Sequence, residues 1–288
     1  MSAPSLVPAR DIESVLEITD GIEAVVLDQF GVLHDGARPY PGAAEAIEAL
    51  RARGLRIAVL SNSGKRAALN AERIRRIGLP LADEDVVMTS GEALRTDIAS
   101  GRVPARRLHA VCGDPDDADR WAEGLEVTFA PIEKAEALLL MGVPDGIEPG
   151  DYEPLLAEAL ARGLPAICTN PDRASPRGGR TVPSVGALAA RYEAMGGAVR
   201  WYGKPHAPVF EALGETLGDP EPHRILMVGD SPAHDVRGAR ALGWRTLLVR
   251  DGLHAGRFAA VPDIDAALDA LLDGEAERPD HTIASLRA

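Results

Sequence analysis

The sequence AVVLDQFGVLHDG occupies residues 24–36 and begins with an apolar run that ends at Asp28. An uninterrupted run of this kind is typical of a strand buried on both faces of a parallel sheet. Similar runs lie at residues 57–60, 86–88, 110–112, 137–141, 225–228 and 246–249. Stretches with helical spacing lie between them, at residues 43–53, 67–77, 152–162, 185–195, 208–217 and 235–242. The alternation predicts an α/β fold whose core is a Rossmann-like, doubly wound parallel sheet.

The chain has 288 residues, which is long enough for two domains. Pro and Gly are dense at residues 143–150 and 170–183, which predicts loops, and the second segment is long enough to suggest a functional loop. No low-complexity linker divides the chain, so an insertion fits better than two domains in series. We expect a discontinuous core domain of residues 1–90 and 200–288 and an inserted, smaller α/β domain of residues 91–199. The tail at residues 278–286 is expected to return to the core as a short strand.

The charge balance excludes some classes of partner. The chain carries 31 basic and 44 acidic residues, a formal net charge of −13. Such a field repels nucleic-acid backbones and acidic lipids, so we expect no nucleic acid and no membrane as partners. No run approaches the ~18 apolar residues of a membrane span, and the N-terminus lacks a signal-like pattern, so a cytoplasmic protein is expected. Cys112 and Cys168 lie in apolar runs and are expected to be free, buried thiols.

Four predicted strands end in polar side chains: Asp28, Ser61, Lys204 and Asp230. In an open parallel sheet, ligands bind beyond the carboxyl ends of the strands, so these side chains are expected to meet in one crevice. Asp28 and Asp230, with Asp235 alongside, would repel one another unless a cation lay between them. Mg²⁺ suits such a set of oxygen ligands. Each of these residues alone could have a purely structural role, since an Asp at the end of a strand is commonly a helix cap. The functional interpretation depends on all four residues occurring in this order.

The segment after Ser61 suits a phosphoryl group. Its hydroxyl and the backbone N–H groups of Asn62 and Ser63 lie at a predicted helix start, where anions bind. Lys204 is one of only three lysines and adds a compact positive charge. A carboxylate held beside phosphorus is a competent nucleophile and forms an aspartyl-phosphate that water later cleaves. The set therefore predicts Mg²⁺-dependent phosphoryl transfer.

The motifs in this order resemble those of the haloacid dehalogenase (HAD) superfamily of phosphohydrolases. The matching segments are LDQFGVLHDG (27–36), LSNSGK (60–65), YGKP (202–205) and VGDSPAHD (228–235). CTNPDR (168–173) and PSVGAL (183–188) resemble segments of the inserted α/β cap of the type IIA, NagD-like branch. The resemblance implies that residues 91–199 form this cap domain, and it leaves open a homodimer formed through the cap.

The resemblance also implies roles for individual residues. Asp28 would be the nucleophile, while Ser61 and Lys204 would hold the phosphoryl group. The metal would be bound by Asp28, the backbone carbonyl of Phe30, Asp230 and, nearby, Asp235. Substrate would be contacted by residues of the phosphate loop and of a cap loop: Asn62, Ser63, Asn170, Asp172 and Arg173.

Phe30 departs from the family pattern, which has a second Asp at this position as general acid and base. General acid–base help is typically worth ~10²–10⁴ in rate, so poor leaving groups such as sugar alcohols should be cleaved slowly. Four nearby residues are candidates to replace the missing group, although each could equally be a turn or surface residue: His34, Asp35, His206 and His234.

Three functions remain open at this stage. The first is a phosphatase acting on a small phosphorylated metabolite through Asp28. The second is a phosphate-ligand binding protein with very slow turnover or none, which Phe30 makes plausible. The third is a 2-haloacid dehalogenase, which the retained Asp230 and Asp235 disfavour because an uncompensated acidic pair would repel an anionic haloacid.

Overall fold

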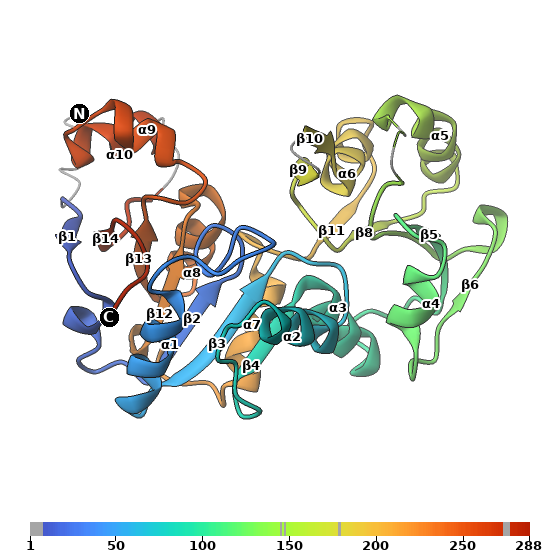
Figure 1. Ribbon diagram of the computed structural model, residues 1–288. Coiled ribbons are helices and arrows are strands. Elements are labelled where there is room, and N and C mark those ends of the chain that lie inside the picture. Colours follow the sequence, from blue (N-terminus) through green and yellow to red (C-terminus); the bar gives the residue numbers. More distant parts are fainter. Residues whose placement is uncertain (1–7, 145, 147, 178–179, 273–276) are drawn as a thin grey trace. The chain divides into compact units, whose positions relative to one another are not determined.

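The computed structural model describes residues 8–144, 146, 148–177, 180–272 and 277–288. The chain packs into two compact units (Figure 1). The first contains the described residues of 1–61, 68–87 and 213–288, and the second contains those of 62–67 and 88–212. The predicted boundaries of a core and a cap domain, at residues 90 and 200, stay predictions.

The first unit is built on a seven-stranded sheet with the order β1-β14-β13-β12-β2-β3-β4. Its strands are β1 (Arg10–Ile12), β2 (Ala24–Asp28), β3 (Arg56–Ser61), β4 (Val86–Thr89), β12 (Ile225–Gly229), β13 (Arg245–Val249) and β14 (His281–Ile283). The pairs from β1 to β3 along this order are parallel. Every residue of β2 and β12 is buried, so both faces of the sheet centre are covered. The α/β class, the parallel core sheet and the short strand in the tail are confirmed.

The order of the strands explains where a site can form. From β2 the chain continues to β3 and β4 on one side, whereas β12, β13 and β14 lie on the other side (Figure 1). The sheet is therefore doubly wound, and the carboxyl ends of β2 and β12 flank the point at which the winding changes direction. Ligand sites of open α/β sheets lie at such a point.

Helices and short helical turns connect these strands. They are η1 (Val15–Ile18), α1 (Ala43–Ala52), α2 (Ala67–Arg76), α7 (Ala207–Thr216), η4 (Pro222–Arg224), the π-helical turn η5 (Pro232–Val236), α8 (Arg237–Ala241), α9 (Ala255–Ala260) and α10 (Ile264–Leu272). Helix α1 buries Ala43, Ala46, Ile47 and Leu50, a spacing that places them on one face. This face joins the core around β2 and β3, where each fully buried Leu or Ile contributes roughly 1.5–3 kcal/mol.

The second unit has its own five-stranded parallel sheet with the order β11-β8-β7-β5-β6. Its strands are β5 (Arg107–Val111), β6 (Thr128–Phe129), β7 (Ala137–Leu140), β8 (Ala166–Cys168) and β11 (Val199–Trp201). The helical elements are α3 (Ser90–Ala99), α4 (Asp117–Ala122), η2 (Ile132–Lys134), η3 (Pro149–Tyr152), α5 (Glu153–Ala161) and α6 (Val185–Ala194). The expectation of a second α/β sheet is therefore confirmed.

The segment at residues 170–183 is only partly the loop that its composition suggests. It contains an antiparallel ribbon of β9 (Ala174–Arg177) and β10 (Arg180–Pro183). The expectation of a loop throughout was wrong here. Proline has no N–H to donate to a neighbouring strand, but it is tolerated at edge-strand positions where that N–H would only have faced solvent. Pro176 lies in β9, opposite Thr181.

Two further expectations concern membranes and cysteines. Among the described residues, no helix is long and apolar enough to cross a membrane. Cys112 and Cys168 are both free, Cys168 being buried and Cys112 half-buried. Burial raises the pKa of Cys168 to about 12 and that of Cys112 to about 11, so both are protonated thiols at neutral pH.

Candidate active site

Three buried carboxylates meet at the ends of neighbouring strands. Asp28 is the last residue of β2, Asp230 follows β12, and Asp235 lies in η5. Each offers one carboxylate oxygen, and these oxygens all lie within 4.8 Å of one another. The register explains the meeting of the first two, because Val228 pairs with Leu27 and both strands run in the same direction. Like charges this close repel one another unless a cation lies between them.

Glycines let the backbone approach these carboxylates. A Cβ on Gly31 would lie 1.7 Å from Oδ2 of Asp230, and one on Gly252 would lie 2.5 Å from the same oxygen. A Cβ on Gly229 would lie 2.2 Å from Cγ of Asp235. Gly31 also has a φ of +87°, which other residues rarely adopt. The acidic cluster is thus enclosed by backbone that only glycine permits.

Backbone donors orient two of the carboxylates. The N–H of Leu253 donates to Oδ2 of Asp230 at 2.7 Å, and the N–H of Ser231 donates to Oδ2 of Asp235 at 3.0 Å. Such bonds fix the direction in which a carboxylate oxygen points. A backbone hydrogen bond therefore fixes the orientation of each of the carboxylates of Asp230 and Asp235.

Phe30 lies two residues beyond Asp28 and is 42% exposed. The ring of His34 meets it edge-on, with centroids 4.7 Å apart at 73°. The guanidinium carbon of Arg73 lies 5.0 Å from the centroid of the Phe30 ring. Gly36 is also close, since a Cβ there would be 3.1 Å from the ring. The ring is thus held from several directions while part of it stays open to solvent.

His34 is fully buried and is bound to its own loop. Its Nδ1 accepts a hydrogen bond from the N–H of Gly36 at 2.9 Å, so the proton of the neutral ring is on Nε2. Nε2 has no hydrogen-bond partner among the described residues. Burial, and then the charge of Arg73, lower the pKa of His34 to about 4. These contacts disfavour His34 as the missing proton-transfer group.

The other three proton-transfer candidates have different surroundings. Asp35 is exposed, and its Oδ1 accepts from the N–H groups of Ala37 and Arg38, which hold its pKa below the usual range. A general acid needs a raised pKa, so this environment disfavours Asp35 as well. His234 lies half-buried in η5, and His206 stacks on Trp201 in the second unit, with ring centroids 5.4 Å apart.

Asn62 links three segments of the second unit. Its Nδ2 donates to Oδ1 of Asp172 at 2.9 Å, and its Oδ1 accepts from the N–H of Lys204 at 2.7 Å. Asn170 accepts from the N–H of Asp172 at 2.9 Å. Three of the residues predicted to contact substrate therefore bind one another or the Lys204 turn. Arg173, the last residue of this group, is exposed.

The segment at residues 62–65, which is predicted to bind phosphate, packs closely against its neighbours. The N–H of Gly91 donates to the carbonyl of Ser63 at 3.1 Å. A Cβ on Gly64 would lie 2.5 Å from Oγ1 of Thr169, at the end of β8. A Cβ on Gly91 would lie 2.1 Å from the carbonyl oxygen of Gly64. The path of this loop therefore depends on two glycines in contact.

Lys204 follows β11 and is only 4% exposed. Its turn is tight, because Gly203 has a φ of +103° and a Cβ there would be 2.6 Å from the ring of Pro171. Lys204 belongs to the second unit, whereas Asp28, Ser61 and Asp230 belong to the first. That Lys204 and these residues share one crevice stays a prediction.

The structure adds residues that the sequence interpretation missed. Gly31, Gly252 and Leu253 surround Asp230, and Arg73 lies on Phe30. One signal was present, because residues 250–254 follow the predicted strand at 246–249 and so lie at the same edge of the sheet. Arg73 carried no local signal, since arginines are frequent in this chain.

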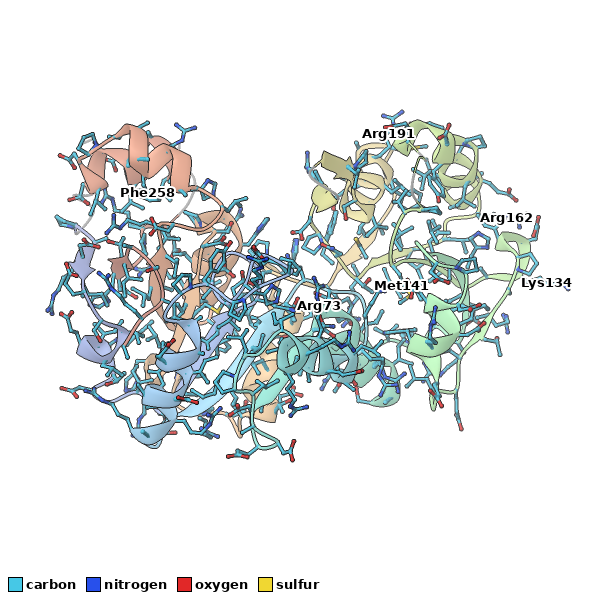
Figure 2. The ribbon with its side chains drawn as sticks, in the orientation of Figure 1. Arg73, Lys134, Met141, Arg162, Arg191 and Phe258 are labelled. Carbon is cyan, nitrogen blue, oxygen red and sulfur yellow. The ribbon has the colours of Figure 1, made fainter. Side chains whose placement is uncertain are left out.

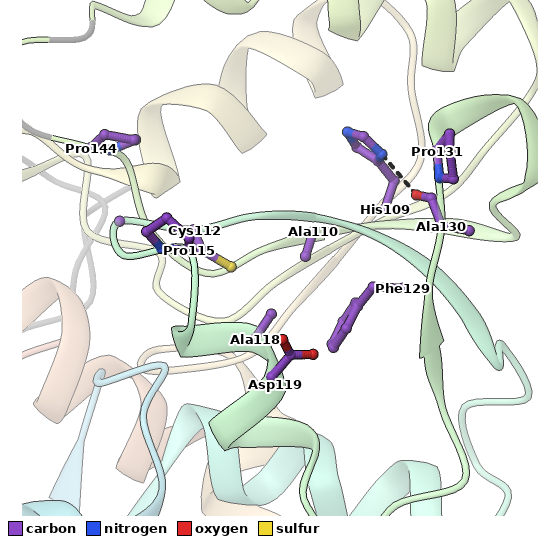
Figure 3. A pocket seen from close by; sticks show the side chains of 11 residues that line it. His109, Ala110, Cys112, Pro115, Ala118, Asp119, Phe129, Ala130, Pro131 and Pro144 are labelled. Carbon is purple, nitrogen blue, oxygen red and sulfur yellow. Dashed lines mark hydrogen bonds between the residues drawn. The ribbon is translucent and has the colours of Figure 1, made fainter.

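A separate open cavity of about 590 Å³ lies in the second unit beside β5 and α4 (Figure 3). His109, Cys112, Asp119 and Phe129 are among the residues that line it. None of the predicted site residues lines this cavity. The protonated Cys112 thiol is a poor nucleophile, so the cavity offers no evident chemistry.

Comparisons with known proteins agree with this geometry. Family models described as haloacid dehalogenase-like hydrolase match residues 25–124 and 115–243, and a HAD-hydrolase-like model matches residues 201–288. The chain is 24% identical to the phospholysine phosphohistidine inorganic pyrophosphate phosphatase of Xenopus laevis over 263 residues, which cover 86% of this chain and 90% of the relative.

Solved structures show the same likeness. NagD from E. coli K-12 has a TM-score of 0.69 and 24% identity, covering 92% of this chain and 96% of its own, which shows a shared fold. A haloacid dehalogenase-like hydrolase from Brucella suis 1330 has a TM-score of 0.79 and 31% identity, covering 96% of this chain and 99% of its own. The resemblance inferred from the motifs is thereby confirmed, and the chain belongs to the haloacid dehalogenase-like hydrolase family.

Proposed function

We propose that this hydrolase is a Mg²⁺-dependent phosphomonoester phosphatase that uses Asp28 as its nucleophile. The observation that carries the proposal is the meeting of Asp28, Asp230 and Asp235, buried and within 4.8 Å, at the carboxyl ends of adjacent strands. Its relative from Xenopus is named as a phosphatase, which supports the same reaction class. The substrate would be a small phosphorylated metabolite.

The acidic cluster fits a divalent cation on chemical grounds. Its ligands are carboxylate oxygens, which hard cations prefer, and they lie close enough together for one cation to contact all three. Gly31 and Gly252 pack against Asp230, and Gly229 packs against Asp235, so closely that a side chain at any of these three positions would collide with a carboxylate. When bound, Mg²⁺ would offset this negative charge and polarise the phosphoryl oxygens.

The chain's own groups would then perform the displacement. A carboxylate oxygen of Asp28 attacks phosphorus, the bond from phosphorus to the leaving oxygen breaks, and its electron pair stays on that oxygen. Water later attacks the phosphorus of the aspartyl-phosphate, which releases phosphate and restores the carboxylate. Ser61 and Lys204 would hold the phosphoryl group, as their strand-end positions and the family motifs suggest.

Phe30 sets the preference among leaving groups in this proposal. A hydrocarbon ring supplies no proton, and the surroundings of His34 and Asp35 disfavour them as substitutes. Unless His206 or His234 supplies a proton, the leaving oxygen departs with its negative charge, which is easy for an aryl phosphate and hard for an alkyl phosphate. We therefore propose that substrates with good leaving groups are preferred.

The direct test measures phosphate release from 4-nitrophenyl phosphate with and without Mg²⁺. Asp28→Asn should remove the activity, because an amide is a poor nucleophile. Asp83→Asn is a matched control, since Asp83 is a fully exposed carboxylate that pairs with Arg75. Activity that survives in Asp28→Asn would exclude the aspartyl-phosphate route.

The second candidate is a phosphate-ligand binding protein, which the loss of the acid at Phe30 favours. It would bind phosphate ligands in the presence of Mg²⁺ and release no phosphate from any substrate with a good leaving group. Calorimetry with inorganic phosphate, run beside the 4-nitrophenyl phosphate assay, separates the two functions.

A further inference from the structure

The guanidinium of Arg73 lies on the loop that directly follows Asp28. Arg73 belongs to α2, and its guanidinium carbon is 5.0 Å from the centroid of the Phe30 ring. Arg73 is labelled in Figure 2. One of its nitrogens, Nη2, donates to the carbonyl of Gly36 at 3.0 Å. Two contacts to one loop thus fix the orientation of this half-buried cation.

Arg73 has no carboxylate partner within the part of the chain that the structure describes. Two arginines on the same helix do have one: Arg75 pairs with Asp83 at 3.1 Å, and Arg76 pairs with Glu72 at 2.6 Å. The chain carries 44 acidic residues, so acidic partners are abundant. A guanidinium has five N–H donors, and that of Arg73 makes one hydrogen bond to a described residue, the one to the carbonyl of Gly36. Donors of Arg73 therefore remain for a ligand.

The position of Arg73 relates it to the acidic cluster of the same unit. Phe30 is two residues from Asp28, so their Cα atoms are at most about 7 Å apart. The next residue, Gly31, packs directly against the carboxylate of Asp230. Phe30 therefore belongs to the loop that leads from Asp28 to the backbone packed against Asp230, and the guanidinium lies on its ring.

The chemistry of this pair differs from that of a general acid. The missing acid would have given a proton to the leaving oxygen, whereas a guanidinium gives hydrogen bonds and positive charge to an oxyanion. Arginine pairs with phosphate and carboxylate groups through two parallel hydrogen bonds. Fixed positive charge at the point where negative charge develops lowers the barrier without any proton transfer. An uncharged leaving alcohol would gain little from it.

We propose that Arg73, held on Phe30, forms a leaving-group subsite that binds a second anionic group of the substrate, as in a phosphoanhydride. The proposal rests on the phosphatase function given above. In the step, Asp28 bonds to one phosphorus, the bridging P–O bond breaks, and its electron pair leaves with the second phosphate, which Arg73 binds as an anion. No proton donor is needed, which matches the absence of an acid at Phe30.

The alternative is that Arg73 only braces the loop through Gly36. A bracing role predicts equal losses on all substrates, because the loop carries Phe30 and Gly31 whatever the leaving group is. A leaving-group role predicts losses that depend on the charge of the leaving group. The two roles are therefore separated by comparing substrates rather than by activity alone.

The test compares wild type with Arg73→Gln, Arg73→Lys and the control Arg76→Gln. The substrates are inorganic pyrophosphate and 4-nitrophenyl phosphate, whose leaving group has no second anionic group. Methylenediphosphonate, which cannot be cleaved, is used as an inhibitor of 4-nitrophenyl phosphate hydrolysis and reports on binding. Inorganic phosphate serves as the control inhibitor.

Arg73→Gln should lower kcat/KM for pyrophosphate by roughly 10–100-fold, as expected for a lost charged hydrogen-bond pair. The Ki of methylenediphosphonate should rise at least about tenfold, while the Ki of phosphate and kcat/KM for 4-nitrophenyl phosphate stay near wild type. Arg73→Lys should be intermediate, and Arg76→Gln should match wild type.

Equal losses on both substrates, or no loss on either, would overturn the proposal. So would a wild type that cleaves 4-nitrophenyl phosphate but neither cleaves pyrophosphate nor binds methylenediphosphonate. A wild type that releases no phosphate from 4-nitrophenyl phosphate would instead contradict the proposed phosphatase function, so the two failures are distinguishable.

Discussion

A Cβ on Gly31 would lie 1.7 Å from Oδ2 of Asp230, so the backbone at Gly31 packs directly against this carboxylate. Gly31→Ala should therefore displace the carboxylate and also strain a φ of +87°. We expect a loss of 4-nitrophenyl phosphate hydrolysis of at least about tenfold, together with a lower Tm. Gly54→Ala is the matched control, because Gly54 has a φ of +78° and a Cβ there would meet no atom within 4 Å.

Gly54→Ala should lose only about 1–2 kcal/mol of stability from the left-handed backbone and keep its activity. Wild-type activity in Gly31→Ala would show that the close approach to Asp230 is unimportant for the site.

Removal of one charge from the acidic cluster should change how the protein responds to magnesium. Asp230→Asn keeps an oxygen for the N–H of Leu253 but relieves repulsion with Asp28 and Asp235. We expect the variant to be at least as stable as wild type in chelator and to lose the rise in Tm that Mg²⁺ gives to wild type. Thermal unfolding with and without Mg²⁺ measures both effects. An equal rise in Tm in both proteins would argue against a cation at this cluster.

Phe30→Asp should restore a proton donor beside the leaving oxygen. The rate on alkyl phosphates such as glycerol phosphate should rise by up to ~10²–10⁴, and much less on 4-nitrophenyl phosphate, whose leaving group needs no proton. Steady-state kinetics on the two substrates measure the ratio. Equal effects on both would contradict the view that the missing acid limits the enzyme.

His34 should make stability depend on pH. Burial, followed by the charge of Arg73, lowers its pKa in the folded protein to about 4, whereas the unfolded chain has the ordinary value of 6.5. The unfolded state therefore binds more protons between these values. Stability contributed by neutral His34 is fully present above pH 6.5 and is lost as the pH falls toward 4, by about 2 kcal/mol between pH 7 and pH 5.

His34→Asn keeps an oxygen that can accept from the N–H of Gly36 but does not titrate. Urea unfolding at pH 7 and pH 5 should show a smaller difference in the free energy of unfolding for this variant than for wild type. The same difference in both proteins would mean that His34 titrates normally in the folded state.

Asn62 should affect the turnover rate because its side chain joins the turns that contain Asp172 and Lys204. Asn62→Ala removes the bonds to Asp172 and to the N–H of Lys204, so both turns lose a common anchor. We expect kcat on 4-nitrophenyl phosphate to fall at least about tenfold. Asp172→Asn keeps an acceptor oxygen for Asn62 and should lose much less. If the two variants behave alike, direct contact of Asp172 with substrate explains the loss better.

Much of this architecture was predictable from local patterns. The apolar runs at residues 24–27 and 225–228 predicted buried parallel strands, and polar residues at their ends predicted the acidic cluster. The helix at 67–77 was predicted to within one residue of α2. β9 and β10 were missed because the sequences ASPR and RTVP contain no apolar run that would mark a strand.

The sequence by itself determined the alternation of strands and helices and the four motifs, because burial on both faces and helical spacing are properties of short segments. Only the tertiary structure decided that Gly31 meets Asp230, that Asn62 binds Asp172 and that Arg73 lies on Phe30. These pairs come together through the order and register of parallel strands. Parallel strands are joined by long crossover connections, so no short segment of the sequence specifies which strands become neighbours. Contacts across such crossovers place the groups that would hold the metal and the leaving group.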